Sequence, residues 1–275
     1  IVATSDDFGT QGAEPTHPGL LDWLAIEFRA NNWSLKELHR LILNSAVYQQ
    51  RSAHRTELAE IDPDNELLAR QYRSRVEAEI IRDLALDASG LMAEKIGGPS
   101  VRPPQPAEYS ALTYANSAKW QTSEGENRYR RGLYTFFQRT SPYPMLMTFD
   151  APDSNVCIAR RPRSNTPLQA LTLWNDVVFT ECAQHLGRRV VQEVASTGKA
   201  EQDISKRVYH AFLTCLSRRP TRPEMATVTA FYRSQLERMS QDEQAARNIL
   251  GEAPMPEAAG LAETASWVAV ARALL

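Results

Sequence analysis

Arginines and aromatic residues are concentrated between positions 128 and 163. This stretch contains seven arginines, no lysine and only two acids, which leaves a local charge of +5. A guanidinium group pairs bidentately with carboxylate, sulfate or phosphate, and it also stacks on aromatic rings. The segment therefore indicates a site for an anionic ligand such as an acidic or sulfated glycan. The candidate ligand-binding arginines are Arg131, Arg139, Arg160, Arg161 and Arg163.

These arginines also have a structural interpretation. An irregular segment must satisfy its backbone polar groups, and guanidinium groups donate readily to carbonyls and carboxylates. In that case the arginines would pair with Asp150, Asp153 and acids on neighbouring helices, and would hold the segment in place. The residue types leave both interpretations open.

Asp150 and Asp153 lie three residues apart in the string TFDAPD. Two carboxylates could serve as acid and base, or could bind a hard cation through their oxygens. An aspartate equally accepts hydrogen bonds from the backbone that follows it and so forms a turn. We keep both residues as site candidates and expect the turn role.

Residues that could bind a metal are sparse. Asp6, Asp7 and His17 are compatible ligands for divalent ions, although His17 precedes a helix start and equally suits capping or loop packing. The three cysteines form no CxxC or CxxCH string, and Cys182 and Cys215 lie on apolar helical faces that favour buried, inert thiols. We therefore assign no metal and no cofactor to this chain.

Composition describes an ordinary globular chain and excludes several classes of function. The 275 residues are 43% apolar and carry a net charge of −2, which disfavours nucleic acid as a partner. No run of 18 apolar residues is present, so we expect no membrane segment in this chain. Gly-x-Ser-x-Gly, P-loop and dinucleotide-binding motifs are also missing, and no motif supports an enzyme class.

Amphipathic helices must position these side chains. Apolar spacing predicts a helix from about residue 20 to 31, and Ser34 with Glu37 predicts a capping box that opens a second helix, with its leucines facing inward. Asp62 followed by proline predicts the start of a long helix that ends near Gly90. Further helices are expected from residues 168, 201 and 221, and a last one contains Trp267.

These elements predict an all-α fold, with amphipathic helices around one core. Between residues 103 and 167 the periodicity fades, and only the run at 132–140 is typical of a strand, so we expect at most one or two short strands. We expect a single helical domain over 1–275 that is truncated at both ends. Its parts are N-terminal helices at 1–102, the irregular arginine- and aromatic-rich segment at 103–167, and C-terminal helices at 168–275.

Five strings along the chain carry a family resemblance. They are DDFGTQG at 6–12, HPGLLDWLA at 17–25, RGLYTFFQRT at 131–140, TFDAPD at 148–153 and NTPLQALTLWND at 165–176. Together they resemble the uncharacterised C-terminal domain of planctomycete-type proteins that also carry a cytochrome c domain. The resemblance implies a multidomain, exported parent protein with an extracytoplasmic location, periplasmic or at the cell surface, and with haem c elsewhere in the parent chain.

Two functions follow as expectations. The first is an accessory or interaction module, whose arginine- and aromatic-rich centre binds an anionic glycan or other domains of the parent protein. The alternative is a catalytic domain acting on carbohydrate-like substrates and coupled to a haem domain, with Asp150 or Asp153 as acid or base.

Overall fold

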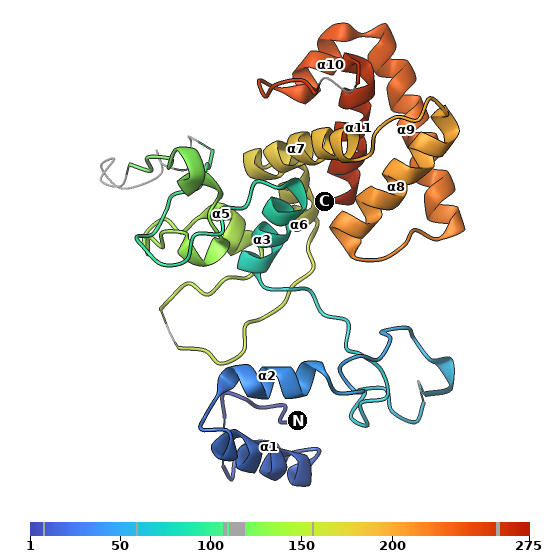
Figure 1. The fold of residues 1–275 in the computed structure, drawn as a ribbon. Helices are drawn as coiled ribbons and strands as arrows, with labels where there is room; N and C mark the ends of the chain where they lie inside the picture. The colour runs from blue at the N-terminus through green and yellow to red at the C-terminus, as the bar shows by residue number, and fades with distance from the viewer. Residues whose placement is uncertain (8, 59, 107–108, 110–118, 156, 257–258) are drawn as a thin grey trace. The chain divides into compact units, whose positions relative to one another are not determined.

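The chain forms two compact units in a computed structural model (Figure 1). The structure describes residues 1–7, 9–58, 60–106, 109, 119–155, 157–256 and 259–275. Unit 1 comprises Ile1–Arg75 with Cys157–Arg161, and unit 2 comprises Val76–Val156 with Pro162–Leu275. The single-domain organisation stays a prediction, because a division into compact units does not establish whether either unit folds alone.

Two short helices dominate unit 1. Helix α1 spans Pro18–Ala30 and begins with proline, and helix α2 spans Leu35–Leu43. The Ser34 side chain accepts a hydrogen bond from the Glu37 backbone N–H, as the capping box predicts. One 3-10 turn, Thr56–Leu58, follows. Neither α1 nor α2 contains a buried residue, so the inward orientation expected for the leucines of α2 is wrong.

The long helix predicted from Asp62 to Gly90 is also wrong in its first half. Helix α3 covers only Ala78–Ser89. The Asp62 carboxylate instead accepts hydrogen bonds from the backbone of Glu66 and Leu67, at 2.7 and 3.0 Å. Leu68 has a positive φ of 54°, which a helix does not allow. Local side-chain bonding therefore replaces helix propagation at this position.

Four helices surround the main core of unit 2: α7 (Val177–Glu193), α8 (Ala200–Leu216), α9 (Arg222–Gln241) and α11 (Leu261–Leu274). Helix α10 (Glu243–Leu250) packs on α9 and α11 through a separate apolar cluster. Trp267 lies at the centre, 1% exposed, and stacks on Tyr232 with ring centroids 4.5 Å apart. A Cβ on Gly187 of α7 would lie 2.6 Å from the Val268 backbone nitrogen. Glycine therefore permits the close crossing of α7 and α11.

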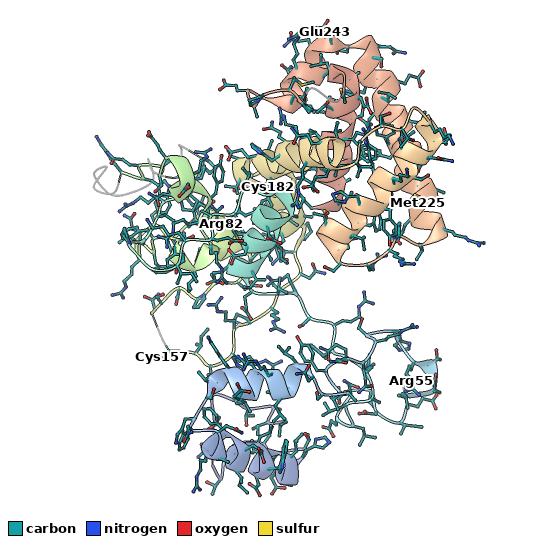
Figure 2. The ribbon with its side chains drawn as sticks, viewed as in Figure 1. Arg55, Arg82, Cys157, Cys182, Met225 and Glu243 are labelled. Atoms are coloured by element: carbon teal, nitrogen blue, oxygen red, sulfur yellow. The ribbon has the colours of Figure 1, made fainter. Side chains whose placement is uncertain are left out.

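A second core joins α3 to α7 through two short helices, α5 (Pro144–Thr148) and α6 (Pro167–Asn175). Leu86, Tyr143, Phe179 and Cys182 are buried here. Figure 2 labels Cys182 on α7. The helix predicted from residue 168 is interrupted at Asp176, whose extended backbone and side chain cap α7 instead. The expected helix therefore becomes two.

The central segment, 103–167, contains α5 and two 3-10 turns, Gly125–Tyr129 and Gly132–Tyr134. The strand-like run at 132–140 forms only one isolated bridge, between Val101 and Thr135. Residues 107–108, 110–118 and 156 of this segment lie outside the described part. The mostly helical fold class is confirmed, and the described residues form no sheet.

Candidate functional site

The arginine-rich centre is held largely by internal contacts. Arg130 is 1% exposed and donates to the backbone carbonyls of Pro99 at 2.8 Å, Lys95 at 3.2 Å and Gly97. Its guanidinium carbon lies 3.7 Å from the centroid of the Tyr134 ring. A cation so enclosed stabilises the turn at 95–99.

Helices α3 and α7 supply carboxylates to the neighbouring arginines. Arg128 forms an ion pair with Glu181 of α7, and this hydrogen bond raises the pKa of Arg128. Arg131 pairs with Asp83 of α3 at 2.9 Å, and Asp83 also accepts from the Gly132 N–H at 2.6 Å. These contacts resemble the structural interpretation, with helix acids as partners in place of Asp150 and Asp153.

Sequence patterns missed the arginine that joins these elements. Arg82 lies on α3 (Figure 2). Its side chain is buried, with 1% exposed. It donates to the Arg128 backbone carbonyl at 2.8 Å. The only sequence pattern that could have indicated this buried arginine is a long charged residue between apolar neighbours at helical spacing. Arg82 and Arg130 are therefore structural cations of the central segment.

The remaining candidate arginines are divided between the two units. Arg139 donates to the Asn155 side chain at 3.3 Å, and Arg163 pairs with Glu77 at 3.3 Å; both arginines are exposed. Arg160 is exposed, Arg161 is half-buried, and both belong to unit 1. Anion binding by these residues stays a prediction.

The two aspartates of TFDAPD make loop contacts. The Asp150 carboxylate accepts from the Ser164 N–H at 2.7 Å and from its hydroxyl at 2.8 Å. Asp153 accepts from the Asn155 N–H at 3.0 Å, and hydrogen bonding to Asn155 lowers the pKa of Asp153. Both carboxylates therefore hold backbone, and a role as catalytic acid or base would require breaking these bonds.

The N-terminal candidates also make local contacts. Asp6 accepts from the Ala159 N–H, and the His17 ring lies 2.9 Å from the Thr16 hydroxyl. Within the described residues, no group of three or more His, Cys, Asp or Glu side chains could hold a metal ion. No described helix is both long and apolar enough to cross a bilayer.

Apolar side chains of unit 1 form an exposed surface. The sequence pattern predicts that the amphipathic helices carrying them pack around a core. Helices α1 and α2 border a groove of about 780 Å³. Outside the groove, Ile26, Trp33 and Leu35 are 62%, 65% and 60% exposed. We name the apolar side chains of α1, α2 and their connecting loop the α1–α2 face. Groove residues of this face include Leu20, Trp23, Leu24, Phe28, Leu38 and Leu41.

Comparison with known families assigns most of the chain to one family. Residues 1–232 match the family model described as PSD1, a protein of unknown function, DUF1553. This family occurs in planctomycete cytochrome-c proteins, in agreement with the resemblance of the five strings. No curated protein and no solved structure matches the chain.

Proposed function

The chain belongs to the PSD1 family of unknown function, DUF1553, and from that premise we propose that it is an interaction module of a larger, exported, cytochrome-bearing protein. In this proposal the α1–α2 face docks on a neighbouring domain of the same polypeptide. The extracytoplasmic location belongs to the same proposal, and the resemblance to cytochrome-bearing proteins supports it.

The observation that carries the proposal is the absence of buried residues in α1 and α2. Helices of 13 and 9 residues are marginal in water by themselves, and most helical stability in proteins comes from packing an apolar face. Here that face is exposed. Large apolar patches on soluble proteins mark interaction surfaces, because their burial contributes roughly 25 cal/mol per Å².

The shape of the face favours a folded domain over an inserted peptide. The groove alone would suit one helix, yet Ile26, Trp33 and Leu35 extend the apolar surface beyond it. The charges at its rim do not select a charged partner, because Arg40 pairs with Glu37 one turn away. A broad and largely uncharged surface of a neighbouring domain matches these features.

We do not extend the proposal to catalysis or to an anionic ligand in the arginine-rich centre. Backbone carbonyls and helix carboxylates already bind the guanidinium groups of Arg130, Arg128 and Arg131. The carboxylates of Asp150 and Asp153 accept hydrogen bonds from their own loop. No contact of these residues favours either function over a structural role.

Hydrogen exchange tests the docking directly. Amide exchange of residues 1–275 alone is compared with exchange of the same residues within the longer cytochrome-bearing polypeptide. We expect strong additional protection of α1 and α2 in the longer protein, and unchanged exchange in α9 of unit 2. Equal exchange of α1 and α2 in both proteins would contradict the proposal.

Paired substitutions locate the contact. Ile26→Asp combined with Leu35→Asp places charges on the α1–α2 face and should abolish the additional protection, because an unpaired charge is costly to bury. Leu133→Asp is the matched control, since Leu133 is 71% exposed but belongs to unit 2. The control should leave the protection intact. If the double variant also does so, the docking surface is not this face.

A further inference from the structure

A polar hollow lies beside the C-terminal end of α3 in unit 2. Its volume is about 680 Å³, and its walls come from the end of α3, from α7 and from the loop at 253–254. Asp87, Glu94, His185 and Gln192 line it. We name this hollow the α3–α7 cleft. Its volume is that of a small-molecule site, and none of the candidate site residues described above belongs to it.

Two arginines fix the walls of the cleft. Arg188 is 5% exposed and donates to the carbonyls of Leu250 at 2.7 Å and Ala253 at 3.0 Å, which anchors the loop to α7. Arg189 bonds to Glu193 at 2.7 Å and to the Ala88 carbonyl at 3.0 Å, which ties α7 to the end of α3. Protein groups thereby bind the donors of Arg188 and most donors of Arg189, so the cleft is poorly suited to an anion.

Four side chains of the cleft remain available. Within the part of the chain that the structure describes, the side chains of Asp87, Glu94, His185 and Gln192 make no hydrogen bond or ion pair. Burial lowers the pKa of His185, so its ring is neutral at neutral pH and can both donate and accept. Together these groups offer several acceptors and a few donors to a ligand.

The position of Asp87 argues against a structural role. It lies in the last turn of α3, where the helix dipole disfavours a carboxylate by roughly 0.3–1 kcal/mol. Its side chain has no compensating partner among the described residues. Asp87 is exposed at the edge of the cleft, so its carboxylate can accept hydrogen bonds from a ligand there.

Charge decides which ligand fits. The cleft contains three carboxylates, from Asp87, Glu94 and Glu193, and two guanidinium groups, from Arg188 and Arg189. One net negative charge remains, which attracts neither anions nor cations strongly. Carboxylates and a side-chain amide suit adjacent hydroxyl groups, because each carboxylate accepts from two donors.

An adjoining hollow of about 540 Å³ extends the cleft. The two share Met92 and Glu94, and the second is also lined by Tyr129, Glu126 and Lys95. A half-buried aromatic ring offers an apolar face to the C–H groups of a sugar ring. We propose that the α3–α7 cleft and this adjoining hollow bind an uncharged sugar chain. This function goes beyond domain docking and uses different residues.

Binding by residues 1–275 is measured calorimetrically with cellohexaose, xylohexaose and mannohexaose. Spermine and a sulfated heparin hexasaccharide serve as the cationic and anionic comparisons. We expect one neutral hexasaccharide to bind, and Asp87→Asn and Glu94→Gln each to weaken it about tenfold or more, through loss of charge-assisted hydrogen bonds. Glu243→Gln is the matched control, because that exposed acid pairs with Arg247 on α10 and should leave binding unchanged.

Thermal unfolding separates ligand binding from structure. Asp87→Asn should keep or raise the melting temperature, because it removes a negative charge from the C-terminal end of α3. The proposal is overturned if no neutral hexasaccharide binds at roughly 10 mM, if both cleft variants bind like the wild type, or if only spermine or the sulfated sugar binds. Any of these results leaves the docking of the α1–α2 face standing, because that surface belongs to unit 1.

Discussion

Replacing Arg130 by alanine should destabilise unit 2 without removing a ligand site. The guanidinium group of Arg130 bonds to three backbone carbonyls and lies 3.7 Å from the Tyr134 ring centroid. Hydrogen bonds to a charged group contribute about 1.5–3 kcal/mol each, and truncating one partner of a buried charged network costs about 3–5 kcal/mol. Residues 95–99 are exposed, so water can rehydrate the freed carbonyls. We therefore expect a loss of about 3 kcal/mol, at the low end of that range.

Urea unfolding followed by far-ultraviolet circular dichroism measures this loss, because unit 2 contains most of the helices. Arg247→Ala is the control, since its ion pair with Glu243 is exposed and contributes about 0.5 kcal/mol or less. A loss below about 1 kcal/mol for Arg130→Ala would refute the structural role. Loss of binding to a sulfated glycan with unchanged stability would instead identify Arg130 as a ligand-binding residue.

Three further outcomes are expected. Gly187→Ala should lower the free energy of unfolding by about 1–3 kcal/mol, because its methyl group would meet the backbone of α11; no loss in urea unfolding would contradict that crossing. Hydrogen bonds from neighbouring hydroxyl and backbone groups lower the pKa of Asp203 from 3.8 to about 2, so stability present at neutral pH should fall as the pH drops from about 4 to 2. Asp203→Asn should flatten this acid dependence in pH-dependent unfolding. Iodoacetamide should modify exposed Cys157 before Cys182, because burial raises the pKa of the Cys182 thiol to about 11. Comparable rates by mass spectrometry would show that the second core, which buries Cys182 between α3 and α7, opens.

Local signals in the sequence predicted the helices whose ends are encoded by neighbouring residues. Thr221 and Glu224 form the reciprocal capping box that opens α9, and Trp267 is buried in the last helix. These features depend on spacing within one or two turns, which the sequence displays directly. The confirmed all-α class follows from the same local rules.

The sequence-based predictions were wrong or missing where a tertiary contact, or a competing local contact, determines the structure. Periodicity from Asp62 to Gly90 indicated one helix, but the Asp62 carboxylate bonds the following backbone and a turn results. Leucines of α2 were assigned to a core because periodicity identifies an apolar face and not what covers it. The α3–α7 cleft left no motif, because Asp87 and Gln192 come from segments about a hundred residues apart.

Unit 1 is built from two separate segments of the chain, and this affects how it folds during synthesis. Its last piece, Cys157–Arg161, follows the first by about eighty residues, and the hydrogen bond from Ala159 to Asp6 joins the two. Unit 1 therefore cannot be completed until the ribosome has made residue 161. Helices α1 and α2 emerge long before that point, with apolar side chains unpaired. The nascent chain should accordingly need a chaperone early. A cut placed after residue 75 should separate the N-terminal part of unit 1 from its last piece, whereas all residues of unit 2 stay in one product.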